Sequence, residues 1–457
     1  MESWNEDRNE NWNEDWNHKM AGQGVKHILV VSGAYAPDRT GIAPLETELC
    51  EYLAAYGHRV SVVTGLPHYP EWTVPPEYRG KWWMEETRAG IHVYRGAIYV
   101  PPRRTTLRRI LFDTSIGVAT ALRGLPIGNV DVVLAVSPPL QAAMAGWMLS
   151  LKNLVPLVLH LQDLIPDLPV ALGMLRNPMA IAMARKMERF LYRRASAIFV
   201  ISEGFRENLL SKRVPESKLV VVPNWTDTRV IGAGSGAGDF RQRHQIGEND
   251  FLVLHTGNMG AKQKLENVIE TAAVLRGDPS IVFCLVGGGT EKNRLEELAV
   301  SRGLKNVRFL ALEPKELLPK MLAAADVLLV NQSAQVIDMV IPSKLVTYMA
   351  AGRAVVAAVA HDSEAARAVD RADCGLVVPP ENPAALASAV LQLKSNRLQA
   401  EKFGRDGRRY AECNFDREPL LARFERALNA VGGNRIGSES QIPDPARMTA
   451  APRQIRK

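Results

Sequence analysis

Two expected helix starts in the second half of the chain carry lysine residues, where a cation is unfavourable. In LHTGNMGAKQKLENVIE, Gly257 and Gly260 lie in a loop, and Lys262 and Lys264 stand where the next helix begins. A cation at a helix N-terminus opposes the helix macrodipole and costs about 0.3 kcal/mol or more, unless an anion lies nearby. The pattern therefore favours an anion-binding site over a solvated surface.

The segment DMVIPSKLVTYMAAGRAVV contains the second lysine-bearing helix start. Pro342 and Ser343 open this helix, Lys344 lies in its first turn, and Gly352 ends it. A capping Ser and an early Pro are ordinary start signals, but they do not account for Lys344. Together the two helix starts could hold a diphosphate and stabilise it as a leaving group, because fixed positive charge would stand where negative charge develops.

The first half of the chain offers two weaker signals. In YAPDRTGIAPLETEL, Thr40 and Gly41 precede a helix whose first turn carries Glu46, so backbone N–H groups could approach a phosphate or sugar oxygen; a plain strand-to-helix turn is the alternative. In LVLHLQDLIPD, His160 and Asp163 lie at a strand end, which places them near a ligand cleft. We treat these two residues as candidate catalytic groups, with a structural histidine as the alternative.

Several common motifs are missing from the sequence. It contains no GxxxxGK[ST], and neither GAGSGAG at 232–238 nor GGGTEK fits a dinucleotide fingerprint. It also lacks HExxH, CxxC and an Asp-x-Asp pair in the expected cleft loops. We therefore expect metal-independent chemistry with no metal-binding residues and no cofactor.

The elements that would position these residues alternate between strands and helices. Apolar runs at 25–32, 59–64, 132–136, 157–161, 197–201 and 219–222 precede a break at 223–238, and further runs follow at 251–255, 281–286, 307–310, 327–330 and 354–358. Such alternation predicts an α/β protein with two doubly wound, Rossmann-like parallel sheets, and a ligand site in the cleft between their carboxyl ends. We expect a disordered leader at 1–24, a first domain at 25–223, a linker at 224–248, a second domain at 249–431 and a disordered tail at 432–457.

The composition limits the class of partner. The chain has 457 residues, 46% hydrophobic and 23% charged, with a formal net charge of +7, which describes a globular protein with anionic partners. The bases lack interleaved aromatic residues, so we expect no nucleic-acid partner. The uncharged stretch 132–151 is long enough to span a bilayer, but Pro138, Pro139 and Gln141 divide it, and we interpret it as a buried strand followed by a buried helix. The first twenty residues are polar and lack a secretory signal, which fits a cytoplasmic protein; residues 1–19 are expected to be dispensable.

One basic segment could contact a membrane. Residues 79–109 carry eight bases and two acids. The expected helix that follows combines Arg104, Arg108 and Arg109 with apolar residues at helical spacing, namely Leu107, Ile110, Leu111, Val118 and Leu122. The helix either packs against the first sheet or docks the first domain on an anionic membrane surface.

The chain resembles family 4 glycosyltransferases with the GT-B fold, and most closely the colanic-acid-type branch that builds bacterial exopolysaccharides. The resemblance covers residues 26–395 and is carried by YAPDRTGIAPLETELCEYLAAYGHRVSVVTGLPHYP, IHVYRGAIYVPP, LHLQDLIPD, VVPNWTDT, the HTGNMGAKQKLENVIE segment, NVRFLAL and IPSKLVTYMAAGRAVV. It implies a retaining, metal-independent hexosyltransferase. The donor would be a nucleotide sugar bound mainly by the second domain, and the acceptor a lipid-linked saccharide bound mainly by the first, on the inner face of the plasma membrane.

The resemblance also assigns roles to individual residues. Lys262, with Gly257 and Asn258 of the preceding loop, would contact the donor diphosphate; Lys344 and Ser343 would bind phosphate and ribose. Gly41 would face the diphosphate, and His160 and Asp163 would lie near the transferred sugar.

The chain departs from the family pattern at one position. Thr347 stands where many relatives have a ribose-binding Glu, and only Asp338, out of register, represents the earlier acid of that motif. A nucleotide-sugar 2-epimerase with the same two-domain architecture is the alternative function, and a non-catalytic sugar-nucleotide-binding protein is a further one.

Overall fold

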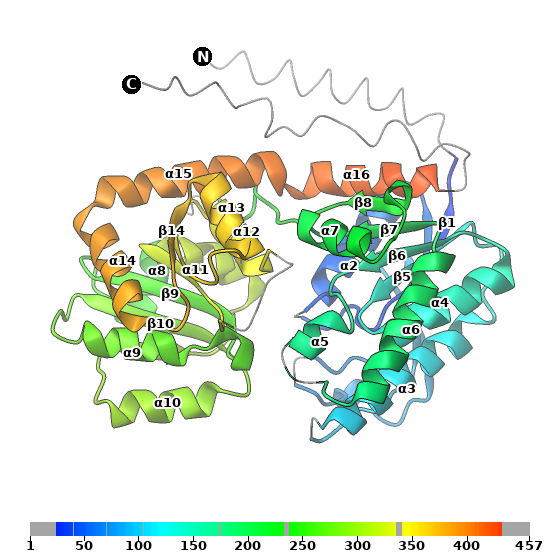
Figure 1. The fold of residues 1–457 in the computed structure, drawn as a ribbon, viewed down its shortest axis with the longest axis horizontal. Helices are drawn as coiled ribbons and strands as arrows, with labels where there is room; N and C mark the ends of the chain where they lie inside the picture. The colour runs from blue at the N-terminus through cyan, green and yellow to red at the C-terminus, as the bar shows by residue number, and fades with distance from the viewer. Residues whose placement is uncertain are drawn as a thin grey trace, which may run out of the picture.

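The structure is a computed structural model that describes residues 24–431, except residues 40, 70, 104, 172, 174, 233–236 and 335–340. The expected leader and tail therefore lie outside the described residues, apart from Gly24, and so do Thr40, Arg104 and Asp338. Within the described residues the chain forms two sheets flanked by helices (Figure 1).

The first sheet has the strand order β3-β4-β2-β1-β5-β6-β7-β8 and is parallel except for the antiparallel pair β3 and β4. Its strands are β1 (His27–Val31), β2 (Arg59–Gly65), β3 (Trp83–Arg88), β4 (Ile91–Gly96), β5 (Val132–Ser137), β6 (Leu157–Leu161), β7 (Ala197–Val200) and β8 (Leu219–Val221). Its helices are α2 (Ala43–Ala55), α3 (Thr106–Gly124), α4 (Leu140–Asn153), α5 (Asp167–Ala171), α6 (Pro178–Arg194) and α7 (Glu203–Ser211). The central strands are continuous runs of Val, Ile, Leu and Ala because both faces of the sheet are covered.

The second sheet has the order β11-β10-β9-β12-β13-β14, and all of its strand pairs are parallel. Its strands are β9 (Phe251–Asn258), β10 (Ile281–Gly288), β11 (Val307–Leu310), β12 (Val327–Asn331), β13 (Ala354–Ala358) and β14 (Gly375–Val378). The helices after β8 are α8 (Ala237–Arg243), α9 (Glu266–Val274), α10 (Lys292–Ser301), α11 (Leu318–Ala324), α12 (Ser343–Ala350), α13 (Glu364–Ala372), α14 (Pro383–Ser395), α15 (Arg397–Asn414) and α16 (Arg417–Ala430). The predicted pair of parallel sheets is confirmed.

Residues 132–151 form β5 and most of α4, divided at the two prolines as predicted. Among the described helices, none is long and apolar enough to cross a membrane. Strands β3, β4 and β14 were not in the predicted set.

The last helix packs on the first sheet, not the second. Leu421, Phe424 and Leu428 of α16 are buried in the same core as α2 and strands β1, β5 and β7. The Phe424 ring lies 4.5 Å from that of Phe199 and 5.1 Å from that of His160, centroid to centroid. The sequence-based boundary that assigned residues up to 431 to the second domain therefore does not describe the packing of α16.

We call the first sheet with its covering helices the first unit, and the second sheet with its covering helices the second unit. The chain crosses between these two units twice, at adjacent points. Trp225 is buried in the first core and Ile231 in the second, while α16 returns to the first. The two crossings are hydrogen bonded to each other, since Thr226 N–H donates to Phe415 O at 2.9 Å and Arg417 N–H donates to Thr226 O at 3.0 Å. The helix α8, within the predicted linker 224–248, contributes Phe240 to the second core.

We expect Phe424→Ala to lower the free energy of unfolding by about 3–5 kcal/mol, because it leaves a cavity between α16 and the first sheet. Urea unfolding followed by circular dichroism measures the change. The matched control is Leu398→Ala on α15, whose exposed side chain can be removed at a change of about 0.5 kcal/mol or less. Equal stability of Phe424→Ala and the wild type would show that α16 is not part of this core.

Candidate functional site

Two glycine-containing loops pack against each other where β9 and β10 end. Gly287 pairs with Gly257 in the sheet register and has φ +140°, and a Cβ on it would lie 2.0 Å from Gly257 O. Gly289, at φ +152°, would place a Cβ 2.4 Å from Met259 O. Only glycine fits at both positions, because a Cβ would meet the backbone of the neighbouring loop, so the two loops pack closely at the carboxyl edge of the second sheet.

Lys344 lies over this edge. Its Nζ is 3.4 Å from His255 Nε2, and it would be 3.8 Å from a Cβ on Gly257. Among the described residues no carboxylate pairs with it. Burial lowers the pKa of Lys344 to about 8. A lysine ammonium group held out of bulk water without a carboxylate is the charge that an anionic ligand would satisfy.

His255 acts as a neutral neighbour of that ammonium group. Its side chain is fully buried, and its Nδ1 lies 3.3 Å from Leu329 O, an acceptor that requires a proton on Nδ1. Nε2 is then free to accept from Lys344. Burial, reinforced by the Lys344 charge, holds the pKa of His255 well below its usual range.

The N-terminus of α12 adds backbone N–H donors next to Lys344. The cap residue is Pro342 and no side chain accepts from the first N–H groups, so the expectation of a capping Ser343 is wrong. Ser343 is instead the first helical residue and is exposed, while half-buried Thr347 donates from Oγ1 to Ser343 O at 3.3 Å. The open helix start, with its partial positive charge, can bind an anion.

Lys262 lies in the short 3₁₀ turn Ala261–Gln263 after the first glycine loop, with its side chain exposed. Asn331, at the end of β12, holds this turn in place. The Asn331 Nδ2 donates to Gln263 O at 2.7 Å and to Lys264 O at 3.0 Å, and the Asn331 Oδ1 accepts from Asn267 Nδ2 at 2.8 Å. Asn331 is buried and all of these groups are satisfied, so it fixes the turn that carries Lys262.

The first unit brings a carboxylate toward Lys262. Asp163 follows β6 and is half-buried. Burial raises the pKa of Asp163, while the positive charges of Lys262 and of Arg109 on α3 act in the opposite direction. The charges of Asp163 and Arg109 in the first unit and of Lys262 in the second therefore act on one another.

His160 has a different place from the one predicted. It is 1% exposed, with its ring against Phe424, and its Nδ1 lies 3.0 Å from Oε1 of Glu46 in the first turn of α2. Its Nε2 lies 3.0 Å from Gln162 Nε2. The prediction that His160 stands near the cleft as a catalytic group is therefore not supported by its position, because the ring is enclosed in the first core.

The contact between His160 and Gln162 supports the segment that carries Asp163. The Gln162 side chain exchanges two hydrogen bonds with that of Asn224, of 3.1 and 2.9 Å, just before the chain leaves the first unit. Gln162, which directly precedes Asp163, thereby links this loop to His160 and to the interdomain segment. His160 is better described as a positioning residue for the loop after β6.

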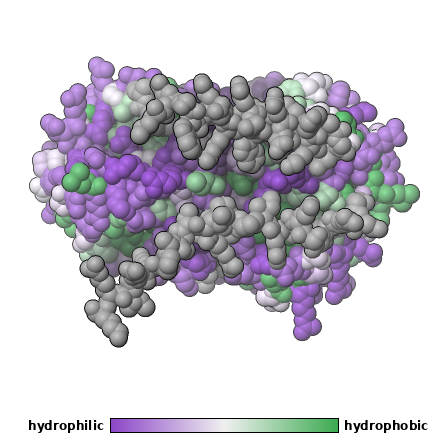
Figure 2. All heavy atoms as spheres, turned by 90° about the horizontal axis from the view of Figure 1, so that it is seen from above, coloured by the Kyte–Doolittle hydropathy of each residue, from purple (hydrophilic) through white to green (hydrophobic). Residues whose placement is uncertain are grey.

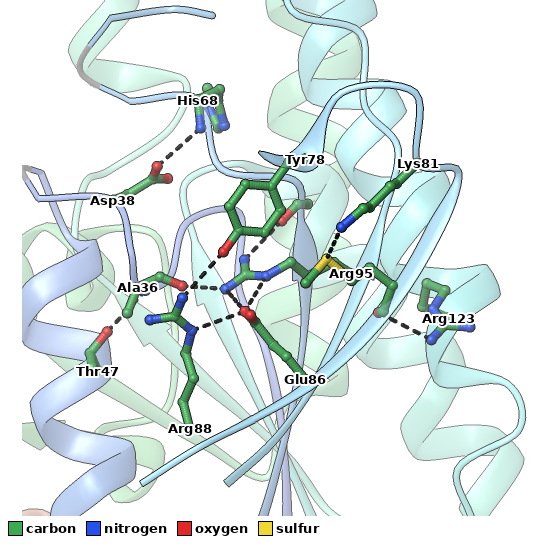
Figure 3. Close-up of polar contacts among 12 residues, drawn as sticks. Ala36, Asp38, Thr47, His68, Tyr78, Lys81, Glu86, Arg88, Arg95 and Arg123 are labelled. Atoms are coloured by element: carbon green, nitrogen blue, oxygen red, sulfur yellow. Dashed lines mark hydrogen bonds and ion pairs between the residues drawn. The ribbon is translucent and has the colours of Figure 1, made fainter. Parts of the chain in front are cut away.

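Gly41 and its surroundings form the loop region above the first sheet. Gly41 has φ +71° and is exposed, one residue before the N-cap of α2, with the Tyr69 ring 3.7 Å from the position of a Cβ. Asp38 holds the facing loop by accepting from the backbone N–H group of His68 at 3.0 Å (Figure 3). It also accepts from the backbone N–H group of Tyr69 at 3.1 Å. Burial raises the pKa of Asp38 and lowers that of His68.

The fully buried guanidinium group of Arg95 on β4 ties these loops to the sheet (Figure 3). It donates to Glu86 at 2.7 Å, to Gly65 O at 3.2 Å and to Ala36 O. A charge this deeply buried is tolerated because a carboxylate and two carbonyl groups satisfy it.

The structure thus assembles Lys262, Lys344, Ser343, Thr347, Gly257 and the exposed Asn258 around one edge of the second sheet, with Asp163 approaching from the first unit. Gly41 lies above the first sheet, and Asp338 falls outside the described residues. Sequence reasoning missed His255, Asn331, Gly287 and Arg109. Polar residues at the ends of buried strands would have indicated the first two. Among the described residues, no group of three or more His, Cys, Asp or Glu side chains could hold a metal ion.

Comparisons with known proteins place this geometry among glycosyltransferases. Residues 40–225 match the family of glycosyl transferase 4-like domains, and residues 237–410 match the glycosyl transferases group 1 family. The chain is 32% identical over 414 residues to the Escherichia coli K12 protein WcaI, described as a colanic acid biosynthesis glycosyl transferase, covering 89% of this chain and 100% of the relative.

Solved structures agree on the fold. Anabaena HepE in complex with UDP-glucose superposes with a TM-score of 0.66 at 18% identity, covering 89% of this chain and 100% of HepE. Sucrose-phosphate synthase of Thermosynechococcus elongatus gives a TM-score of 0.66 at 19% identity, covering 88% of this chain and 98% of the synthase. At these identities the likeness concerns the fold alone.

Proposed function

Since the chain belongs to family 4 of the GT-B glycosyltransferases, in the branch of the colanic acid enzymes, we propose that it transfers a hexosyl unit from a nucleotide sugar, with retention of anomeric configuration. The acceptor in this proposal is a lipid-linked saccharide of exopolysaccharide or surface-polysaccharide biosynthesis. HepE, which has the same fold, is solved with UDP-glucose, and this favours a UDP-sugar as the first donor to test.

The observation that carries the proposal is the Lys344 ammonium group. It is desolvated and has no carboxylate partner among the described residues, and it lies beside a glycine edge and an uncapped helix N-terminus. A donor diphosphate placed there would receive one lysine, the N–H groups of α12 and the backbone of two glycine loops. Each of these interactions strengthens as the diphosphate gains charge on leaving, which is the requirement for catalysis.

In this proposal the donor diphosphate accepts the proton of the acceptor hydroxyl, and Asp163 binds the transferred sugar. The acceptor hydroxyl attacks the anomeric carbon while the bond to the diphosphate breaks, and a diphosphate oxygen takes the hydroxyl proton on the same face. Lys262, exposed and borne on the turn that Asn331 fixes, neutralises the departing group. Asp163 would then bind hydroxyl groups of the transferred sugar, its charge balanced by Lys262 and Arg109.

We expect Lys344→Ala and Lys262→Ala each to lower kcat by about 10²-fold or more while the melting temperature changes little, as removal of a transition-state donor does. Release of UDP from UDP-glucose in the presence of acceptor measures the rate. The matched control is Lys264→Ala, two residues from Lys262, whose Nζ already lies 3.9 Å from Glu266 Oε1. Wild-type rates in both test variants would move the diphosphate site elsewhere.

We expect the affinity for UDP to fall as the pH rises through about 8. The pKa of Lys344 is lowered to about 8 in the free protein, and a bound diphosphate raises it, so binding takes up a proton. Above about pH 8 the loss approaches tenfold per pH unit if only the ammonium form binds. Calorimetric titration over this range measures it, and Lys344→Met should be weaker but nearly independent of pH. A Lys344→Met profile that follows the wild type would assign the pH dependence to another group.

We expect turnover to continue in EDTA, because lysine side chains and a helix N-terminus supply the positive charge that a divalent cation would otherwise supply. Initial rates with EDTA, and after addition of Mg²⁺ or Mn²⁺, measure this. Complete loss of activity in EDTA that either ion restores would contradict metal independence.

A further inference from the structure

Helix α3 carries two apolar stripes, of which only one is used by the fold. Phe112 and Ile116 face the first core. The other stripe is exposed, with Leu107 at 68%, Leu111 at 50% and Val118 at 53% exposure, and Leu122 one turn further on. The helix therefore packs against the first sheet with one face, as one of the two alternatives expected, but the apolar residues singled out from the sequence lie on the exposed outer stripe.

The outer stripe lines a groove together with the hairpin of β3 and β4. The groove has a volume of about 500 Å³, with Trp82, Trp83 and Tyr99 on one wall and Leu111, Val118 and Leu122 on the other. Trp82 is 77% exposed and Trp83 is 52% exposed. We call these six residues, with Leu107, the α3–hairpin surface. An apolar cluster of this size on one face of a protein marks an interaction site.

The aromatic wall is held in place although it is exposed. The Arg123 guanidinium lies 5.4 Å from the Trp83 ring centre and 5.6 Å from that of Tyr94, and it pairs with Glu85 at 2.7 Å. Tyr99 N–H donates to Ser115 Oγ of α3 at 2.9 Å, which joins the two walls. The surface is therefore preorganised, so a partner binds it without a large ordering cost.

Basic residues lie next to this surface in the chain, since Lys81 directly precedes Trp82 and Arg108 directly follows Leu107. Arg79, Lys81, Arg103 and Arg108 form no ion pair with a carboxylate of the described residues, whereas the two acids of segment 79–109 are neutralised, Glu86 by Arg88 and Arg95 and Glu85 by Arg123. Arg109 does not belong to this group of unpaired bases. It pairs with Asp113 at 3.0 Å and lies over the Phe112 and Trp72 rings, so the sequence-based grouping of Arg104, Arg108 and Arg109 is not the relevant set.

We propose that the α3–hairpin surface is a membrane-docking site, in which the apolar wall enters the headgroup region of an anionic lipid leaflet and the four unpaired bases contact lipid phosphates. An apolar stripe on a helix, flanked by bases and bordered by Trp and Tyr, has the chemistry of an interfacial membrane contact. The opposite side of the molecule, which bears α15 and α16, is mainly hydrophilic where described residues are visible (Figures 1 and 2). We therefore place the membrane contact on the side that bears α3 and not on the side that bears α15 and α16.

Co-sedimentation of the full chain with vesicles tests the proposal. Phosphatidylcholine vesicles with phosphatidylglycerol should bind the wild type at low salt, and binding should weaken as salt is added. Trp82→Ser with Leu111→Ser should reduce partitioning by about tenfold or more, since two large apolar side chains no longer enter the lipid. The matched control is Val300→Ser with Leu398→Ser, equally exposed apolar residues on α10 and α15, which should bind as the wild type does.

A second pair of variants tests the charges. Lys81→Glu with Arg108→Glu should reduce binding to the anionic vesicles by about tenfold or more, whereas Lys305→Glu with Arg276→Glu on the second unit should leave it unchanged. Wild-type chain that ignores the anionic vesicles, or equal binding by all variants, would overturn the proposal. So would a dimer in solution that Trp82→Ser with Leu111→Ser dissociates, since the surface would then join two copies of the chain.

The test is separable from the catalytic proposal. UDP binding by the second unit should be the same in all four double variants, because none of the substituted residues lies near Lys344 or Lys262. A docking failure with normal UDP binding therefore concerns the membrane alone. Normal vesicle binding without UDP binding would leave docking intact and remove the donor assignment.

Discussion

The central constraint on this molecule is a half-buried lysine ammonium group that has no carboxylate partner among the described residues. Lys344 has His255 as its polar neighbour, and a hydrogen bond to Leu329 keeps that histidine in the tautomer that can accept. A carboxylate at this point would compete with an anionic ligand, so the free protein is left with a charge that is only partly satisfied. The uncapped start of α12 shares this property, since no side chain of the described residues accepts from its first N–H groups.

The loops of the first unit are fixed by more hydrogen bonds from buried side chains than the carboxyl edge of the second sheet is. Arg95 fastens the loops after β1 and β2 from within the sheet, and Asp38 holds the backbone at His68 and Tyr69. Asp163 is braced indirectly, through Gln162 and the His160 ring. The two sides of the site therefore differ in kind: the second unit supplies unsatisfied positive charge, and the first supplies side chains whose partners are already fixed.

Much of this architecture could be predicted from the sequence, for identifiable reasons. The central strands are continuous apolar runs, and the two lysines stood out because the sequence placed both at helix starts. The structure confirms this for Lys344 on α12, whereas Lys262 lies in a 3₁₀ turn before α9. Strand β3 was missed because it lies at the sheet edge and its sequence, WMEETR, contains three charged residues and no continuous apolar run. The place of His160 could not be predicted, because its ring is enclosed by α2 and by a helix from the far end of the chain. For α3, periodicity identified the apolar residues, but only packing showed that Phe112 and Ile116 face inward while Leu107, Leu111 and Val118 do not.

The return of α16 to the first sheet has a consequence for synthesis on the ribosome. One face of that sheet is built from strands made early, yet part of its cover, Leu421, Phe424 and Leu428, is among the last of the described residues to be translated. The usual order, in which an N-terminal unit folds as soon as it emerges, cannot apply in full here. The second unit, whose cores contain no α16 residue, can close first, and the nascent first unit must keep an apolar face open until α16 has been made. The first unit is therefore begun before the second but completed after it, and during that interval it exposes apolar surface of the kind that leads to aggregation.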